Sequence, residues 1–86
     1  MKLSKDFLTH NTGDDAVLVS TGKAEFSGVV RGNKTLGAIL DILKADTTED
    51  EIVRKMKERF DASEEIIRKD VNKVLTELRN IGALDE

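Results

Sequence analysis

The amino-acid sequence changes character near residue 32. Up to that point it contains most of the six glycines and short runs in which apolar and polar residues alternate, whereas beyond it apolar residues recur at helical spacing. Alternation with a period of two is typical of half-buried strands, and recurrence every three or four residues is typical of amphipathic helices. The sequence therefore predicts an α+β fold in which a small sheet precedes the helices.

Three short runs in the first part are predicted to be strands. They span residues 7–11, 16–20 and 25–30. Turn-forming residues at 12–15 separate the first two strands, and residues 21–23 are short enough to close a hairpin between the second and the third. The third run is less regular, which leaves its register open. We expect a three-stranded antiparallel sheet with exposed edges.

Three helices are predicted in the second part, each starting after a capping residue. Asn33, Thr48 and Ser63 precede apolar runs with helical spacing, and Glu51 stands three residues after Thr48 in the pattern of a capping box. The apolar stripes of these helices, which we expect to form the core, are Leu36, Ile39, Leu40, Leu43, Ile52, Val53, Met56, Phe60, Ile67, Val71, Val74, Leu75, Leu78 and Ile81.

Two glycines have a place in this helical pattern. Gly37 lies inside the first predicted helix, where glycine costs about 1 kcal/mol relative to alanine. Its missing side chain would permit close packing against the sheet or another helix. Gly82 follows the last apolar position of the third helix and is expected to end it.

Length and composition limit the class of protein. A chain of 86 residues has apolar material for a single core, so we expect one domain over residues 1–86. It contains no cysteine, which excludes disulfides, thiolate metal sites and a cysteine nucleophile. It has neither the apolar run of a secretory signal nor a stretch long enough to cross a bilayer. We expect a cytoplasmic protein, and a homodimer remains open because small domains are marginally stable.

The charge distribution argues against a nucleic-acid partner. The net charge is −3, from 14 basic and 17 acidic residues that are mixed along the sequence. Three Phe without any Trp or Tyr leave few platforms for stacking single-stranded bases. Acids and bases are balanced in the third predicted helix, so no strong positive field would face a duplex. A winged-helix DNA-binding or regulatory domain is the alternative that the order of elements allows.

No residue pattern indicates catalysis, a metal site or a cofactor. The single histidine, His10, has no carboxylate at an obvious ligand spacing. Asp14 and Asp15 fall in a turn, and the acids at 49–51 fall in the first turn of a helix, where backbone requirements explain them. Residues 28–35 lack the Gly-Lys-Ser/Thr ending of a phosphate loop. We therefore expect a protein that is not an enzyme, with no catalytic residues, no metal site and no cofactor.

The order of these segments resembles that of a known family. The segments that carry the likeness are residues 30–36, 39–43 and 48–53, then Phe60, Asp70, Val71, Val74, Leu75 and Leu78, and finally residues 81–84. Over residues 5 to 85 they are similar to the coenzyme PQQ synthesis protein D (PqqD) family. The resemblance implies a winged-helix-like fold with a three-stranded antiparallel sheet followed by three helices. Residues 25–30 depart most from the family pattern.

The resemblance also implies a function, that of a non-catalytic peptide chaperone. Such a module binds the leader of a ribosomally made precursor peptide, which is added as a strand beside the third strand and the third helix. It then presents the peptide to a modifying enzyme, often a radical SAM enzyme. The implied pathway is the biosynthesis of PQQ or of another peptide-derived natural product, and the implied partners are the leader and that enzyme.

The resemblance places the peptide between the third strand and the third helix. The expected peptide-binding residues are Phe26, Ser27, Gly28, Val29, Val30, Arg68, Lys69, Asp70, Val71, Lys73, Val74 and Glu77. The strand residues would supply the edge, the charged helix residues would contact peptide charges, and Val71 and Val74 would line an apolar pocket. The helical stripe alone favours another interpretation, in which Val71, Val74, Leu75 and Leu78 are buried core and the charged face is solvated.

Overall fold

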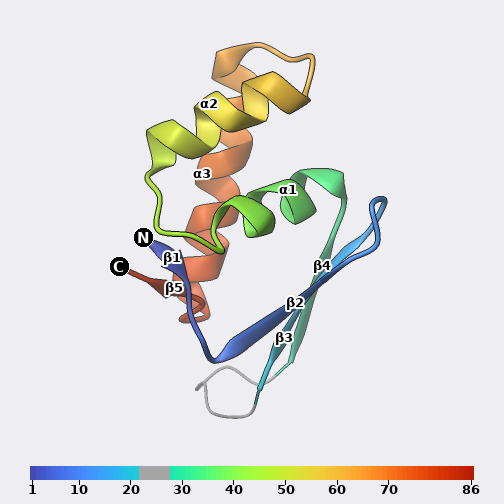
Figure 1. Ribbon diagram of the computed structural model, residues 1–86, viewed down its shortest axis with the longest axis vertical. Helices are drawn as coiled ribbons and strands as arrows, with labels where there is room; N and C mark the ends of the chain where they lie inside the picture. The colour runs from blue at the N-terminus through green and yellow to red at the C-terminus, as the bar shows by residue number, and fades with distance from the viewer. Residues whose placement is uncertain (22–27) are drawn as a thin grey trace.

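The computed structural model describes residues 1–21 and 28–86. Its elements follow the chain as β1 (Lys2–Leu3), β2 (Phe7–Asn11), β3 (Ala16–Ser20), β4 (Val29–Gly32), α1 (Lys34–Ile42), α2 (Glu49–Arg59), α3 (Glu64–Asn80) and β5 (Leu84–Asp85). The sheet lies on one side of α1, while α2 and α3 lie on the other (Figure 1). The predicted α+β class, a three-stranded antiparallel sheet followed by three helices, is confirmed.

The main sheet has the strand order β2-β3-β4, with both pairs antiparallel. The first two strands have the predicted bounds. The third is described from Val29 to Gly32, so its predicted end at Val30 is two residues too early. The reason is pairing, because β3 begins at Ala16, and Ala16 and Val17 pair with Gly32 and Arg31. Residues 25–27 of the predicted strand lie outside the described residues.

A second, smaller sheet joins β1 to β5, and no sequence pattern predicts it. Lys2 pairs with Asp85 and Leu3 with Leu84, so β1 and β5 lie side by side next to the lower end of α3 (Figure 1). Gly82 makes this possible, since its φ of 74° turns the chain back after α3. Strands of two residues are too short to produce an alternating pattern, which is why this pair was missed.

The helix starts follow the predicted caps. The Asn33 side chain accepts hydrogen bonds from the backbone N–H groups of Thr35 and Leu36, at 3.1 and 3.4 Å. Ser63 caps α3 in the same way. At α2, Thr48 accepts from the N–H of Glu51 at 3.2 Å, which is half of the predicted capping box. The Glu51 carboxylate instead accepts from the Thr47 hydroxyl at 3.0 Å, so the second half of the box is replaced by a contact between side chains.

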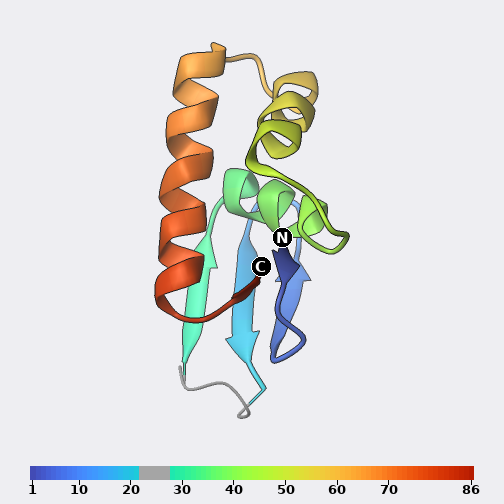
Figure 2. The same ribbon diagram turned by 90° about the vertical axis from the view of Figure 1, so that its left-hand side faces the viewer.

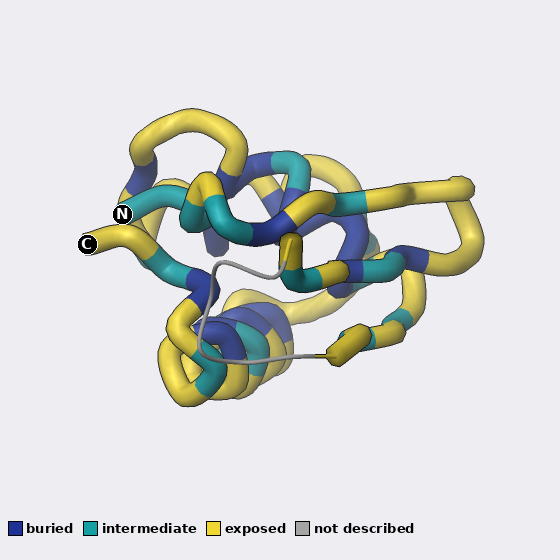
Figure 3. The backbone as a smooth tube through the Cα atoms, turned by 90° about the horizontal axis from the view of Figure 1, so that it is seen from below, coloured by how far each residue is buried: buried dark blue, intermediate teal, exposed yellow. Residues whose placement is uncertain are grey.

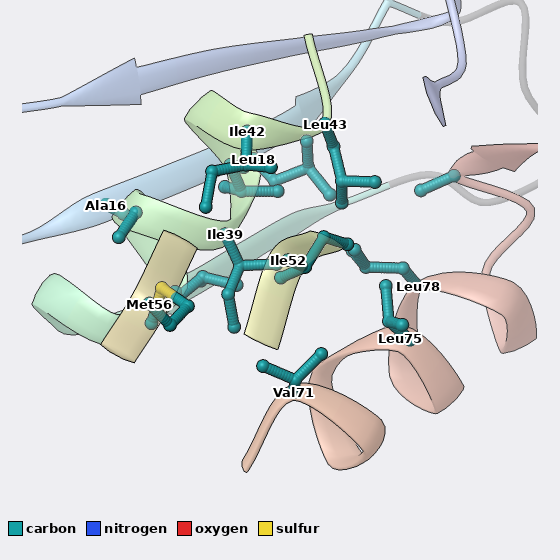
Figure 4. Packing of buried hydrophobic residues seen from close by; sticks show 14 of the residues in the cluster. Ala16, Leu18, Ile39, Ile42, Leu43, Ile52, Met56, Val71, Leu75 and Leu78 are labelled. Carbon is teal, nitrogen blue, oxygen red and sulfur yellow. The ribbon is translucent and has the colours of Figure 1, made fainter. Parts of the chain in front are cut away.

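The core lies where β3 and the three helices meet (Figure 4). Leu18 of β3 and Ile39 of α1 are fully buried, as are Ile52 of α2 and Val71 of α3. Gly37 packs as expected for a residue without a side chain. A Cβ added there would lie 2.6 Å from the Nδ2 atom of Asn11 on β2, so glycine allows α1 to lie directly on the sheet. None of the helices in the described part of the chain is long and apolar enough to span a membrane.

Candidate functional site

A groove separates β4 from α3. β4 is the edge strand on the side of the sheet that lies toward α3, as the views from the side and from below both show (Figure 2, Figure 3). The groove has a volume of about 290 Å³. Its strand side and the start of α1 contribute Val30, Arg31, Gly32, Asn33, Thr35 and Leu36, and α3 contributes Asp70, Lys73, Val74 and Glu77.

The α3 wall of the groove carries three exposed charges around a partly buried valine. Asp70, Lys73, Val74 and Glu77 are spaced at i, i+3, i+4 and i+7, which places them on one face of the helix. Within residues 1–21 and 28–86, the three charged side chains form no ion pair. The wall therefore presents two acids and one base whose charges are available to a bound molecule.

The β4 wall of the groove offers unpaired backbone groups. The N–H of Ser20 donates to the carbonyl of Gly28, so this pair is a hydrogen-bonded pair of the antiparallel ladder. Such pairs alternate along the ladder. Val30 and Gly32 therefore direct their backbone groups toward β3, while Val29 and Arg31 direct theirs away from it. Among residues 1–21 and 28–86 no strand pairs with this edge of β4, which thus carries two N–H and two carbonyl groups that an added strand can bond.

The groove floor depends on Gly32. A Cβ at this position would lie 2.5 Å from Cδ2 and 2.8 Å from Cβ of Leu36. Glycine thus lets the first turn of α1 approach the end of β4. Beside it, Val30 is partly buried and packs against the core. The floor is therefore apolar, with charged groups on the α3 wall above it.

The structure brings five of the sequence-predicted residues together in the groove. These are Val30, Asp70, Lys73, Val74 and Glu77. Gly28 and Val29 are exposed at the beginning of the strand, and the Val29 side chain lies beside Val19 on the far face of the sheet. Phe26 and Ser27 lie outside the described residues.

The other predicted helix residues lie elsewhere on α3. Val71 is fully buried, so it belongs to the core, as the helical stripe alone favoured, and not to an open pocket. Lys69 is exposed and does not line the groove. Arg68 faces α2, where one of its Nη atoms lies 2.9 Å from Asp50 and 3.3 Å from Glu49. The hydrogen bond to Asp50 raises the pKa of the Arg68 guanidinium.

Five groove residues were missed by the sequence reasoning. They follow directly after the predicted strand and are Arg31, Gly32, Asn33, Thr35 and Leu36. The first two were missed because the register was open, and the structure pairs Ala16 and Val17 with Gly32 and Arg31. No signal in the sequence marked Thr35 and Leu36, whose position depends on how α1 packs against the sheet.

The groups that line the groove are suited to binding a ligand. Free backbone groups, an apolar floor and fixed charges suit an extended peptide that needs hydrogen bonds on one side and side-chain contacts on the other. In the described part of the chain, no three His, Asp or Glu residues gather closely enough to hold a metal ion.

Comparison with known proteins shows first a similar fold and then the family. The fold is similar to that of a solved structure described as TbiB1 in complex with the TbiA(beta) leader peptide, with a TM-score of 0.81 and 19% sequence identity over 99% of this chain and 95% of that one. The family model for coenzyme PQQ synthesis protein D (PqqD) matches residues 15–84, so the chain belongs to the PqqD family. A search of curated proteins found no match.

Proposed function

We propose that this protein is a non-catalytic peptide chaperone that binds the leader of a ribosomally made precursor peptide and presents it to a modifying enzyme. The leader is added as a strand to the free edge of β4, with α3 as the second wall of the groove. The observation that carries the proposal is the outward direction of the Val29 and Arg31 backbone groups beside that groove. Membership of the PqqD family and the likeness to a protein solved with a leader peptide support it.

Strand addition explains how one small surface binds a peptide with useful affinity. Each backbone hydrogen bond contributes about 0.5 to 1.5 kcal/mol net, independently of the peptide's side chains. Specificity comes from the alternate peptide residues that face α3, since these contact Val74 and the charges of Asp70, Lys73 and Glu77. The protein thus recognises a sequence pattern while it holds the backbone in an extended form.

The peptide runs antiparallel to β4 in this proposal. All pairs of the main sheet are antiparallel, and such pairs have straighter hydrogen bonds than parallel ones. The amino-terminal side of the bound segment then lies near Gly32 and α1, and its carboxyl-terminal side lies near Val29. A leader held in this way leaves the modifiable core of the precursor outside the groove.

Presentation to an enzyme follows from effective concentration. A precursor tethered through its leader reaches a nearby active site at a local concentration set by the connecting segment, without any new contact to the core peptide. No cofactor is needed for this role. The modifying enzyme, for which a radical SAM enzyme is our first candidate, supplies the chemistry, in PQQ biosynthesis or another peptide pathway.

The first experiment captures the ligand and then tests the edge of β4. The tagged protein is used to recover peptides from its source cells, these are identified by mass spectrometry, and the recovered leader is synthesised and titrated. Arg31→Pro removes one outward N–H and leaves the β3–β4 hydrogen bonds in place. We expect this variant to bind the leader about twofold to tenfold more weakly than Arg31→Ala, which loses the same charge but keeps the N–H.

The comparison of the two variants separates strand addition from side-chain contact. If Arg31→Pro binds as tightly as Arg31→Ala, the leader does not pair with β4 and the proposal is wrong. Recovery of duplex DNA or transcription machinery without any peptide would favour a winged-helix regulatory domain instead. Circular dichroism of both variants checks that the fold is intact.

A further inference from the structure

A second, smaller hollow opens beside the groove, where the three helices meet. It has a volume of about 110 Å³. Its interior is formed by Met56 and Phe60 of α2 and its end, Ala62 of the following loop, and Ile67 of α3. Met56 and Ile67 are almost fully buried, at 2% and 4% exposure, so the inside of this pocket is apolar.

The pocket adjoins the groove. Thr35 of α1 and Asp70 of α3 line both of them. These two residues are the polar part of the pocket lining and lie between the pocket and the groove. A peptide that runs along β4 toward α1 therefore comes close to the pocket when it leaves the strand.

The size of the pocket limits what can enter it. At about 30 Å³ for each water-sized group, it has room for about four heavy atoms, which is the side chain of leucine, isoleucine or methionine. A charged or amide group placed against Met56 and Ile67 would lose its hydration, because the hydrogen-bonding groups of Thr35 and Asp70 are at the rim and not in the interior. An aromatic ring is too large.

We propose that this apolar pocket binds one aliphatic side chain of the bound peptide, located on the amino-terminal side of the segment that pairs with β4. The inference rests on the proposed function and adds a specificity rule to it. The direction follows from the antiparallel geometry, because β4 runs toward α1 and a peptide of opposite direction begins at that end. The peptide is thus recognised by its extended backbone in the groove and by an aliphatic anchor upstream of it.

The test uses a displayed library of random linear peptides as the probe, so it does not depend on the natural leader. Peptides selected on the wild-type protein are expected to share Leu, Ile or Met at one fixed position upstream of a strand-forming segment. Ala62→Phe fills the pocket from an exposed loop position. Peptides selected on this variant should lose the aliphatic preference and keep the remaining pattern. Asp61→Phe is the matched control, since it adds the same ring next to the pocket without lining it.

Titration with one selected peptide measures how much the aliphatic anchor contributes to the binding affinity. Replacing its aliphatic anchor by alanine should weaken binding to the wild-type protein by about tenfold or more, because most of a buried aliphatic side chain is removed. The same replacement should change the affinity for Ala62→Phe by less than about twofold, because that variant no longer offers the pocket. Phe60→Leu enlarges the pocket and should shift the selected residue toward phenylalanine, which provides a second test if Ala62→Phe fails to fold.

The outcomes distinguish the pocket from the groove. Selected peptides whose binding is lost in Arg31→Pro, but which share no aliphatic position, would overturn the pocket and leave strand addition intact. Selected peptides that bind Arg31→Pro and Arg31→Ala equally well would overturn the proposed function itself. An aliphatic preference that survives in Ala62→Phe would place the anchor elsewhere.

Discussion

The two sides of α3 differ in how their charges are used. On the side toward α2, Arg68 pairs with Asp50 and Glu49, and Asn72 donates a hydrogen bond to Glu49 at 3.2 Å. On the side toward β4, the exposed charges form no ion pair within the described residues, and they are Asp70, Lys73 and Glu77. One helix therefore has a side whose charges are satisfied within the protein and a side whose charges are available to a partner.

This difference shows how a small domain can keep charged groups available for binding on one side of a helix while the other side is used for its own stability. Charges that are already paired must be separated before they can contact a ligand, whereas hydrated and unpaired charges need only exchange water for the ligand. The unpaired charges also surround Val74, which is partly buried at the groove. Substitutions on α3, at the groove floor and at a separate ion pair are expected to differ accordingly, from the largest effect to the smallest.

The largest expected effect is a loss of stability, and it should differ between Val71 in the core and Val74 in the groove. Val71→Ala removes two methyl groups from a fully buried site and should lower the free energy of unfolding by about 2 to 3 kcal/mol. Val74→Ala acts at a partly buried site and should cost less stability, but it should weaken peptide binding. Urea unfolding measures the first effect and peptide titration the second. Equal stability losses in both variants would mean that Val74 is core as well.

A smaller effect is expected at the groove floor. Gly32→Ala places a methyl group 2.5 Å from Cδ2 and 2.8 Å from Cβ of Leu36, so α1 must shift. We expect a stability loss of about 1 to 3 kcal/mol, near the lower end because the groove beside it is open. Gly37→Ala is the matched comparison, since its new methyl would lie 2.6 Å from Nδ2 of Asn11, whose side chain must then give up its exposed hydrogen bonds with Gly13 and Asp41. Alanine favours the helix by about 1 kcal/mol, so thermal unfolding should show a smaller loss for Gly37→Ala than for Gly32→Ala.

The two kinds of charge on α3 should respond in opposite ways to substitution. Lys73→Glu should leave the stability within about 0.5 kcal/mol of the wild type and weaken leader binding about threefold to tenfold, since it makes that wall wholly acidic. Arg68→Gln should lower the stability slightly and leave leader binding unchanged, because it breaks the pairs with Glu49 and Asp50. The stability change should shrink at high salt. Weaker leader binding by Arg68→Gln would contradict the division between the two sides of the helix.

The smallest expected effect is on the pH dependence of stability, and it concerns the ion pair of Arg79 with Glu86, which lies outside the groove and outside the contact of α3 with α2. Bonds from the Arg79 guanidinium at 3.1 to 3.2 Å hold the pKa of Glu86 below its ordinary value of 4.5. A lowered pKa in the folded state stabilises the protein above pH 4.5, and this contribution is lost as the pH falls through the lowered value. Acid unfolding of Glu86→Gln should therefore be slightly less steep than that of the wild type. Asp61→Asn, a loop substitution, is the control for a general change in charge.

Much of the local structure could be predicted from sequence because it depends on neighbours along the chain. The caps Asn33, Thr48 and Ser63 act on backbone groups two or three residues away, and their residue types suffice to predict helix starts. The alternation in residues 7–11 and 16–20 likewise gave both strands with correct bounds. The β1–β5 pair could not be found in this way, since it joins two-residue segments from opposite ends of the chain.

The candidate site was predictable as a region but not residue by residue. The spacing of Asp70, Lys73, Val74 and Glu77 places them on one face of a helix, whatever the rest of the chain does. The same spacing cannot tell which neighbouring face meets α2. Arg68 was therefore grouped with the groove residues, although it contacts Glu49 and Asp50, which the chain brings to α3 from a separate helix.

The sequence by itself determined the class of fold, the starts of the helices and the absence of cysteine chemistry, because periodicity, caps and composition act locally or on the whole chain. The tertiary structure decided that β4 is a free edge, that Val71 is core while Val74 lines the groove, and that Met56 and Ile67 form a pocket next to that groove. These properties depend on how separate elements pack, and an amphipathic pattern fixes only which side of each element faces inward.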